Sequence, residues 1–486
     1  MGRQSKGHAI MISVPYQGHI NPYTNLALKL ASKGFTVTFV HLEFVHYKLS
    51  KAHHSASNGE AVDLFSEARE SGLDIRYATI GDGLPLEFDR DLHFDEYWEM
   101  IFCDFEARVD EFVAEIIRSD PYSVYFLVTD TVYTWPGNIA DKYGLVNVSF
   151  WTQPALVFSL VYHWDLLTQM GHFPAKDKTE EINYIPGVKS INTKDLMSYL
   201  EEPVLSNIMA RSTYLSFERV KKADFILHNT VEELEPDVIS ALNKYQPNYA
   251  IGPITFSRNL ASNNVSKSLC SESDCTQWLE SKSPASVLYV SFGSFVHTNK
   301  QIIEEIAYGL LLSEVNFIWV VRDGILDSGD ASVLPVGFED EIREKGLIVP
   351  WCNQIMVLSN PAVGGFVTHN GWNSTVESMW FGVPMICYPI ACEQPTNRKL
   401  VVDDWKIGIN LVDGECVERI EIAEKIKSFM RGDFISKSLM VEADKVKGKM
   451  RKALETDGSS EINFDQFIKD LEAKIHSKAA NVDKLC

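Results

Sequence analysis

A repeated alternation of short apolar runs with helical segments sets the fold class of this chain. It begins with the apolar run His8–Val14, the helical segment Asn21–Lys33 and the apolar run Phe35–Val40. Such a β-α-β unit builds a parallel sheet with helices on both faces. Further strands are expected at Tyr125–Thr129, Val146–Phe150, Phe225–Asn229, Tyr249–Ile251, Ser286–Ser291, Asn316–Arg322, Leu347–Val349, Val363–Thr368 and Pro384–Tyr388, with helices at Pro136–Tyr143 and Lys300–Ser313.

One segment, Ser257–Cys275, interrupts this alternation. It is rich in Ser and Asn and nearly lacks large apolar residues, which is typical of a linker. A chain of 486 residues is also too long for a single core. We therefore expect two doubly wound α/β domains, over 1–256 and 276–456, and a ligand site in the cleft at the C-terminal ends of their strands. Residues 457–486 are expected to form a helix that packs back on the first domain.

The composition limits the partners. The chain has 66 Asp and Glu against 45 Lys and Arg, a formal net charge of −21, which repels a phosphate backbone and argues against nucleic-acid binding. Eight cysteines without a CxxC pair indicate a reduced, intracellular protein. The apolar run near the N-terminus is too short for a signal peptide, and the longest apolar stretch, Ala155–Tyr162, is far short of a membrane span. We expect a cytoplasmic protein without a membrane span.

The strongest local signal lies in the segment Trp351–Gln394. There the run GGFVTH predicts a strand that ends at His369, followed by a tight turn at Gly371 and a helix that Asn373 or Ser374 can cap. The backbone N–H groups and the dipole of a helix N-terminus favour a phosphate. The segment therefore predicts an anion site, although each residue alone fits a plain core strand, turn and helix equally well.

Other side chains of the same segment suit the rest of a nucleotide sugar. Trp351 could stack on a planar base, and Glu377 could accept hydrogen bonds from ribose hydroxyls. Glu393 and Gln394 could hold a polyol. The assembly, more than any single residue, indicates a nucleotide-sugar site.

A histidine and an aspartate follow two of the expected strands. His19 lies after the first strand and just before a helix, and Asp130 directly follows Tyr125–Thr129. Alone, the first fits a helix-start histidine and the second a helix cap or a solvated carboxylate. Together they predict a general base and the carboxylate that fixes its tautomer.

The 44-residue segment Trp351–Gln394 resembles the signature box of the plant family-1 UDP-glycosyltransferases. The box begins with Trp, contains HxGWNSxxES and ends in an acid followed by Gln. GHINP, VTD, SFGS and SSEINFDQFI extend the resemblance over nearly the whole chain. It implies the glycosyltransferase B fold, two Rossmann-like domains facing across a cleft, with an N-terminal acceptor-binding domain and a C-terminal UDP-sugar-binding domain.

The resemblance also implies roles for individual residues. The expected donor contacts are Trp351 and the backbone of Cys352 for uracil, Gln354 and Glu377 for ribose, Ser294, His369, Asn373 and Ser374 for the diphosphate next to the Gly371 turn, Trp372, Glu393 and Gln394 for the sugar, and Thr152 for its 6-hydroxyl region. In this family a final Gln usually accompanies UDP-glucose.

The activity implied by the resemblance is an inverting O-glucosyl transfer. His19, assisted by Asp130, would deprotonate a hydroxyl or carboxyl group of a phenolic, flavonoid or terpenoid acceptor, and a β-glucoside would form. The helix N-terminus, His369 and Ser294 would hold the charge of UDP, so neither a metal nor another cofactor is expected. The chain is expected to be a monomer that serves secondary metabolism.

The acceptor site is the least explicit part of the sequence. The candidates for its wall are Tyr16, Gln17, Phe158, Tyr162 and Ala391. The box usually ends in a sequence like PLFADQ and here ends in PIACEQ, so Ala391 replaces a bulky aromatic residue and Glu393 is one methylene longer than the usual Asp. Asn370 likewise stands where Cys or Ser is common.

Two alternatives stay open at this stage. A catalytically silent UDP-sugar-binding protein would have no need of the pair His19 and Asp130, and both are present. A glycoside hydrolase would need two carboxylates flanking one sugar, and no such paired motif stands out.

Overall fold

The computed structural model describes residues 6–53, 63–175, 179–201, 208–257, 268–326, 333–414, 416–432 and 434–482. The chain forms two compact units. Unit 1 comprises Met1–Thr193, Tyr199–Cys270 and Lys452–Cys486, and unit 2 comprises Lys194–Ser198 and Ser271–Arg451. Residues 258–267 of the expected linker lie outside the described residues. The grouping of Lys194–Ser198 with unit 2 was not foreseen, because only its contacts in the folded chain reveal it.

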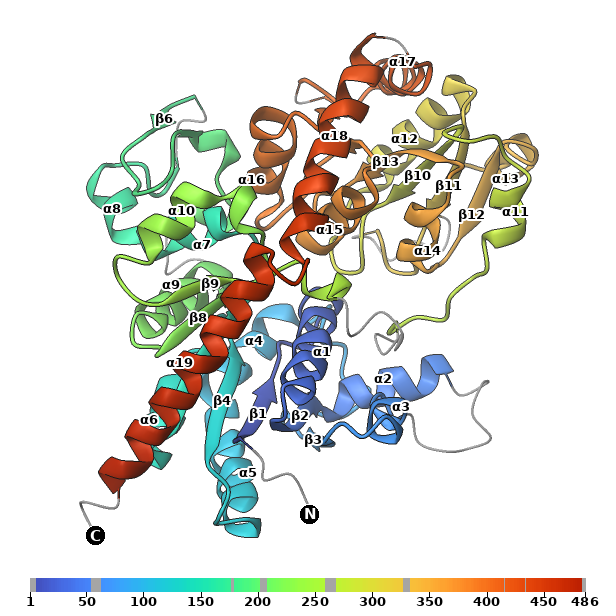
Figure 1. Cartoon of the computed structure of the whole chain (residues 1–486). Coiled ribbons are helices and arrows are strands. Elements are labelled where there is room, and N and C mark those ends of the chain that lie inside the picture. Colours follow the sequence, from blue (N-terminus) through green and yellow to red (C-terminus); the bar gives the residue numbers. More distant parts are fainter. Residues whose placement is uncertain are drawn as a thin grey trace. The chain divides into compact units, whose positions relative to one another are not determined.

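Unit 1 is built on a seven-stranded parallel sheet with the order β3-β2-β1-β4-β5-β8-β9 (Figure 1). Its strands are β1 (His8–Ile12), β2 (Thr36–Leu42), β3 (Ile75–Ile80), β4 (Tyr125–Asp130), β5 (Val146–Trp151), β8 (Phe225–His228) and β9 (Asn248–Ala250). Every residue of β1, β2, β4 and β5 is buried, as expected for parallel strands covered on both faces. The strand order reverses between β1 and β4, which is where ligands bind in such sheets.

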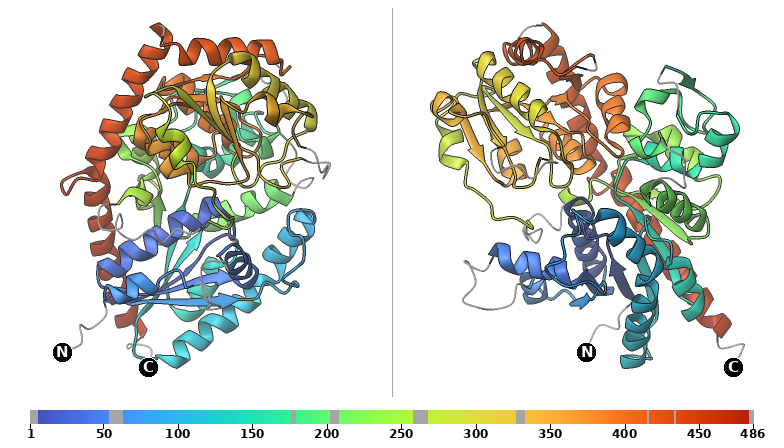
Figure 2. Two further views of the ribbon diagram at one scale, coloured as in Figure 1. Left: turned by 90° about the vertical axis from the view of Figure 1, so that its right-hand side faces the viewer. Right: turned by 180° about the vertical axis from the view of Figure 1, so that it is seen from behind.

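The helices of unit 1 cover both faces of this sheet, with α1 on one side and α5 on the other (Figure 2). They are α1 (Gln17–Ser32), α2 (Glu43–His53), α3 (Ser66–Glu70), α4 (Phe94–Cys103), α5 (Phe105–Ser119), α6 (Pro136–Tyr143), α7 (Ala155–Tyr162), α8 (Trp164–Gln169), α9 (Ile208–Val220), α10 (Pro236–Leu242) and α19 (Ser459–Val482). The last of these, α19, packs along β9 and β5, and its Phe464, Phe467 and Leu471 are fully buried in the core of unit 1. A two-stranded antiparallel pair, β6 (Glu181–Ile182) and β7 (Ile191–Asn192), completes the unit.

Unit 2 contains a six-stranded parallel sheet with the order β12-β11-β10-β13-β14-β15, again with helices on both faces (Figure 2). Its strands are β10 (Val287–Ser291), β11 (Asn316–Val320), β12 (Gly346–Val349), β13 (Val363–Thr368), β14 (Met385–Cys387) and β15 (Gly408–Asn410). Its helices are α11 (Thr276–Glu280), α12 (Lys300–Ser313), α13 (Phe338–Glu341), α14 (Gln354–Ser359), α15 (Trp372–Phe381), α16 (Gln394–Lys399), α17 (Arg419–Met430) and α18 (Phe434–Ala453), the last of which ends in unit 1. Here the order reverses between β10 and β13.

The prediction of two Rossmann-like α/β domains is confirmed. The expected strands are all present to within two residues at each end, but β3 and β15 of the two large sheets were missed. β15 has three residues, and β3 lies at the sheet edge with four of its six residues not fully buried, so neither leaves a continuous apolar run in the sequence. The sequence pattern places His19 just before the first helix. The helix begins at Gln17, so His19 instead lies inside its first turn.

Candidate functional site

The two candidate catalytic residues of unit 1 are in contact. His19 is in the first turn of α1, after β1, and Asp130 is the last residue of β4, so the topology of the sheet brings them together at the point of reversal. His19 Nδ1 lies 2.7 Å from Asp130 Oδ2. This contact places the proton on Nδ1 and leaves Nε2 with a lone pair, which is the arrangement a general base requires.

The carboxylate of Asp130 is buried and held from several sides. Its side chain is 1% exposed, whereas that of His19 is 17% exposed. The backbone N–H of Val132 donates to Oδ1 at 3.3 Å, and that of Val14 approaches Oδ2 at 3.5 Å. The hydroxyl of Thr152, which we expected near a sugar 6-hydroxyl, lies 3.3 Å from His19 Nδ1. Asp130 therefore has a fixed position, while the imidazole remains partly accessible.

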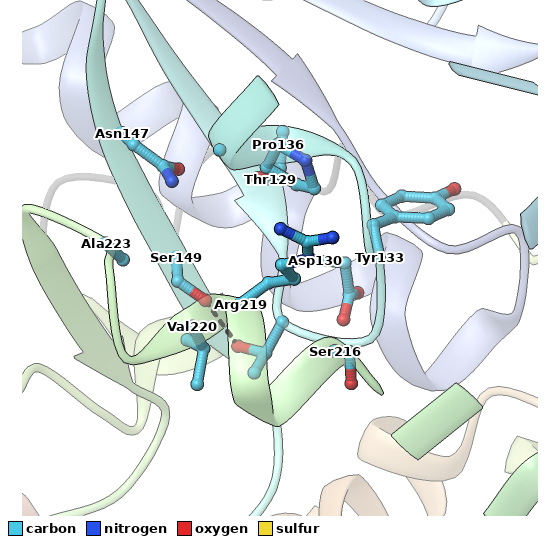
Figure 3. Close-up of a pocket in the computed structure, with 12 residues that line it drawn as sticks. Thr129, Asp130, Tyr133, Pro136, Asn147, Ser149, Ser216, Arg219, Val220 and Ala223 are labelled. Atoms are coloured by element: carbon cyan, nitrogen blue, oxygen red, sulfur yellow. Dashed lines mark hydrogen bonds between the residues drawn. The ribbon is translucent and has the colours of Figure 1, made fainter. Parts of the chain in front are cut away.

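A pocket of about 240 Å³, including the open space at its mouth, lies beside Asp130 and is lined by the end of β4 and by Asn147 and Ser149 of β5 (Figure 3). The Ser149 and Thr131 hydroxyls meet there at 2.7 Å, which is the dashed line in the figure. Thr129 Oγ1 and Asn147 Oδ1 are buried without a hydrogen-bond partner among the described residues. The lining combines these polar groups with the apolar side chains of Pro136, Val220 and Ala223, and the hydroxyl and amide groups offer hydrogen bonds to ordered water.

The acceptor candidates of unit 1 differ in their surroundings. The ring of Tyr16 is half-buried and stacks on Trp98 at a centroid distance of 6.0 Å. Gln17 has both ends of its amide engaged, since Nε2 donates to Asn21 Oδ1 at 3.0 Å and Oε1 accepts from the N–H of Leu269 at 3.1 Å. The acceptor-binding role of both residues stays a prediction. Tyr16 could contact an acceptor with the exposed part of its ring, whereas the amide of Gln17 is already hydrogen-bonded within the protein.

Two further candidates lie on α7. Phe158 has no exposed surface and packs against Trp151 and Phe217, which is the environment of a core residue. Tyr162 is only half-buried and stacks on Phe158 at 5.8 Å. Core packing thus explains Phe158 without an acceptor, and of the two only Tyr162 has surface to offer one.

In unit 2, the imidazole of His369 is enclosed by two glycines. His369 follows β13, and Gly293 follows β10, the neighbouring strand at the point of reversal. A Cβ atom placed on Gly293 would lie 2.5 Å from His369 Nε2, and one on Gly371 would lie 2.4 Å from it. Any side chain at either position would collide with the ring, so glycine is required at both. Burial lowers the pKa of His369 to about 4, so the ring is neutral near pH 7.

The loop around Gly293 is held by an arginine that the sequence reasoning missed. Arg322 Nε donates to the carbonyl oxygen of Gly293 at 3.2 Å, and its guanidinium also donates to that of Val296. Ser294 is exposed on this loop, which leaves its hydroxyl accessible to a ligand. Arg322 is the last residue of an expected strand, and this position was the only sign in the sequence that it could lie near the site.

The start of α15 corrects one expectation. The helix begins at Trp372 with Gly371 as its N-cap, and no side chain caps it, so Asn373 and Ser374 lie in the first turn and are not caps. The N-terminal turn of a helix directs backbone N–H groups outward, and such groups bind anions well. The Trp372 side chain is buried, with its ring 6.2 Å from that of Trp405, so a sugar contact of this residue would have to come mainly from its backbone.

Three expected donor residues form one hydrogen-bonded cluster. Gln354 Nε2 donates to Glu377 Oε2 at 2.7 Å and to Ser374 Oγ at 3.0 Å. The hydroxyl of Tyr289 donates to the other amide atom, Gln354 Oε1, at 3.3 Å. Burial raises the pKa of Glu377 to about 7, against the opposing effect of the hydrogen bond from Gln354. The cluster is a polar site whose internal hydrogen bonds are already formed.

Trp351 and Cys352 are fixed by a short segment from the start of unit 2. The N–H of Ser273 donates to the carbonyl oxygen of Trp351 at 2.8 Å, and Ser273 pairs with Cys352 as an isolated parallel bridge. Cys352 is buried, whereas Trp351 is partly exposed. These contacts fix the backbone at the two residues that we expect to bind uracil, Trp351 at the face of the base and Cys352 at its edge.

The end of the signature segment is a tight loop closed on itself. Gln394 Oε1 accepts from the N–H groups of Ile390 at 2.8 Å and Ala391 at 3.0 Å, which leaves Nε2 as the group that can reach a ligand. Cys392 has a φ of 58°; its N–H donates to Ser198 Oγ at 2.8 Å, and its carbonyl oxygen accepts from the N–H of Ser198 at 2.9 Å. Glu393 lies between these two fixed residues. Ser198 carries no motif, so its role was not visible in the sequence.

Nowhere in the described ranges do three or more His, Cys, Asp or Glu side chains gather in a way that could hold a metal ion. Within the same ranges, every helix is too short or too polar to cross a membrane.

Comparisons with known proteins cover nearly the whole chain. The family model described as "UDP-glucoronosyl and UDP-glucosyl transferase" matches residues 191–445. UDP-glycosyltransferase 86A1 of Arabidopsis thaliana is 49% identical, with 99% of this chain and 98% of that protein covered. The 7-deoxyloganetin glucosyltransferase of Catharanthus roseus is 35% identical, with 96% and 97% covered. The crystal structure of Os79 from O. sativa in complex with UDP has a TM-score of 0.80 at 26% identity and covers 96% of this chain and 100% of that one.

Proposed function

Because this chain belongs to the plant family-1 UDP-glycosyltransferases and has their glycosyltransferase B fold, we propose that it transfers glucose from UDP-glucose to a small lipophilic acceptor. The accepting group is a hydroxyl or carboxyl of a phenolic, flavonoid or terpenoid compound, and the product is a β-glucoside. The choice of glucose is supported by Gln394 at the end of the signature segment and by relatives that are named glucosyltransferases.

The single observation that carries the proposal is the contact between His19 and Asp130 at 2.7 Å. The buried carboxylate keeps the Nδ1 proton in place, so Nε2 takes the proton of the acceptor hydroxyl. The imidazolium that forms is stabilised by the same carboxylate. The deprotonated oxygen then attacks the anomeric carbon from the face opposite UDP, which inverts the configuration of an α-linked donor.

The departing UDP requires stabilisation of its negative charge. We assign this task to the first turn of α15, to His369 and to Ser294 on the loop after β10. Burial keeps His369 neutral, so it acts by donating a hydrogen bond and not by its charge. In this proposal, hydrogen-bond donors of the protein alone stabilise the negative charge of UDP, and neither a metal nor another cofactor takes part.

The nucleoside end of the donor would occupy the cluster of Gln354, Ser374 and Glu377. The carboxyl of Glu377 is aligned by Gln354 at 2.7 Å and accepts hydrogen bonds from the ribose hydroxyls. Trp351 stacks on the uracil ring, and Glu393 and Gln394 bind the hydroxyls of glucose. The protein would act as a cytoplasmic monomer in secondary metabolism.

The proposal is tested by incubating the purified protein with UDP-glucose and a mixed panel of phenols, flavonoids and terpenoids. We expect glucosides whose anomeric proton shows the β configuration by NMR, formed equally well after treatment with a chelator. An α-glucoside would overturn inversion, and hydrolysis of UDP-glucose without transfer to any acceptor would overturn the proposed acceptor class. Trp351→Ala should raise the KM for UDP-glucose and leave that for the acceptor unchanged, since a lost stacking contact costs about 1–3 kcal/mol.

A further inference from the structure

A buried asparagine on α16 bonds both parts of the donor site of unit 2. Asn397 has no exposed surface, and its Nδ2 donates to the carbonyl oxygen of Asn370 at 2.8 Å and to Glu393 Oε1 at 3.3 Å. Asn370 lies between His369 and Gly371, in the turn assigned to the diphosphate, and Glu393 is assigned to the sugar. One amide group thus contacts the two segments that would hold neighbouring parts of UDP-glucose.

The orientation of this amide is fixed by its surroundings. A flipped amide would place Oδ1 against a carbonyl oxygen and a carboxylate oxygen, which repel it. In the observed orientation Oδ1 is instead buried without a hydrogen-bond partner among the described residues. An unpartnered buried oxygen is costly, but the flipped amide would lose both hydrogen bonds of Nδ2 and place its oxygen against two other oxygens, so the observed orientation is the better one.

The two segments depend on Asn397 to different degrees. Asn370 has a φ of 64°, and it is held independently, because its N–H bonds Thr368 Oγ1 at 3.1 Å and its Nδ2 contacts Cys387 Sγ at 3.2 Å. The backbone next to Glu393 is held through Cys392, which bonds Ser198, whereas Asn397 donates directly to the Glu393 carboxylate. Loss of Asn397 should therefore disturb the Glu393 carboxylate more than the diphosphate turn.

We propose that Asn397 is a positioning residue that aims the Glu393 carboxylate at the hydroxyls of the transferred sugar, and so contributes to sugar selectivity. The inference rests on the proposed binding of UDP-glucose in unit 2. Glu393 is one methylene longer than the residue usual in this family, which gives its carboxylate more freedom and a greater need for such a restraint. The chemistry recognised is that of a hexose hydroxyl, which donates to a carboxylate oxygen.

The test is Asn397→Ala in the full-length protein, with UDP and UDP-glucose as separate ligands. We expect kcat/KM for UDP-glucose to fall about tenfold, the usual effect of one hydrogen bond to a charged group, while the Kd of UDP changes less than about threefold. In competition between UDP-glucose and UDP-galactose, the share of galactoside should rise. Ser378→Ala is the matched control, because it also removes a buried hydrogen bond, from Oγ to the carbonyl oxygen of Val383 at 2.7 Å, at a position of α15 to which no donor contact is assigned.

Two results would overturn the positioning role. Equal losses for UDP and UDP-glucose would show that Asn397 only supports the turn, and an unchanged kcat/KM and galactoside share would show that it has no role in selectivity. Glu393→Ala separates this from a failure of the proposed function. If Glu393→Ala leaves UDP-glucose turnover unchanged, the assignment of Glu393 to the sugar is wrong. If Glu393→Ala lowers turnover and the double variant with Asn397→Ala is no slower, Asn397 acts through Glu393. Should Asn397→Ala not fold, Asn397→Ser, which retains one donor, replaces it.

Discussion

The imidazole of His19 and the carboxylate of Asp130 meet at 2.7 Å, although 111 residues separate them in the chain. The contact exists because β1 and β4 are neighbours in the sheet, so that the segment after one strand meets the end of the other. Asp130 is buried and His19 is partly accessible, which gives the two residues unequal roles. The accessible imidazole can meet a substrate, and the buried carboxylate can only act through it.

The first prediction concerns this pair. His19→Ala should lower kcat by about 10²–10⁴-fold, the usual contribution of a general base, and leave the Kd of UDP nearly unchanged. The acceptor should be an alkyl alcohol, since a phenol or carboxylic acid ionises without help. His476→Ala, at an exposed site on α19, is the control. Undiminished turnover of the alcohol by His19→Ala would remove His19 from the reaction.

The second prediction concerns the glycines around His369. Gly371→Ala has an acceptable backbone angle, with φ at −57°, but its Cβ would lie 2.4 Å from His369 Nε2 and displace the ring. Overfilling a packed site costs about 1–3 kcal/mol, so the Kd of UDP, measured by calorimetry, should rise about tenfold. Gly448→Ala on α18 meets no atom within 4 Å and should bind UDP normally. Normal UDP binding by Gly371→Ala would show that the position of His369 does not matter to the nucleotide.

The third prediction is a pH dependence of stability. Burial raises the pKa of Glu377 to about 7, whereas the unfolded chain ionises this group near its ordinary value of 4.5. Between these values the folded state holds the proton and the unfolded state does not. Stability contributed by the protonated carboxyl is therefore complete below about pH 4.5 and is lost as the pH rises to about 7.

This dependence is isolated by comparing the wild type with Glu377→Gln. The variant cannot ionise at this site, so its unfolding free energy should rise relative to the wild type by about 2–3 kcal/mol from pH 4.5 to pH 7.5. Glu339→Gln, at an exposed position of α13, should show no such trend. A constant difference across this pH range would mean that the carboxyl of Glu377 titrates near its ordinary value in the folded protein.

The fourth prediction concerns acceptor size. The N–H of Ala391 is held by Gln394 Oε1 at 3.0 Å, so a substitution here changes the side chain without freeing the loop. Ala391→Phe should lower kcat/KM for large aglycones about tenfold more than for small phenols, with the KM for UDP-glucose little changed. Ala391→Ser, similar in size, is the control. Equal losses for both sizes of acceptor would mean that residue 391 does not contact the acceptor.

Much of the fold could be predicted because parallel strands that are buried on both faces leave continuous apolar runs. β1, β4 and β13 were expected nearly at their observed bounds for this reason. The edge strand β3 was missed because partly exposed residues break the apolar run. The start of α1 was placed too late, at Asn21, whereas the helix begins at Gln17 and the backbone N–H groups of His19 and Ile20 already donate to the carbonyl oxygen of Tyr16.

The candidate site likewise contains residues that the sequence could predict and residues that it could not. Its candidate catalytic and ligand-binding residues, such as His19 and Glu377, stand in recognisable local motifs. The residues that hold these groups in place do not, because their partners are remote in sequence: Ser198 meets Cys392 across 194 residues, and Arg322 meets Gly293 across 29. Only a folded chain shows such pairs. The prediction that Asn373 or Ser374 caps α15 failed for a local reason, since Gly371 already serves as the N-cap.

The division of the chain between the units has a consequence for any attempt to produce half of the protein. The polypeptide passes from one unit to the other at residues 193, 198, 270 and 451, so no single cut of the gene separates them. A fragment beginning at Ser271 would lack Ser198, the residue that bonds Cys392 in its left-handed conformation. A chain shortened to end before α19 would lose Phe464 and Phe467 from the core that the N-terminal strands form. Truncation at the C-terminus should therefore show itself first as aggregation of the N-terminal half.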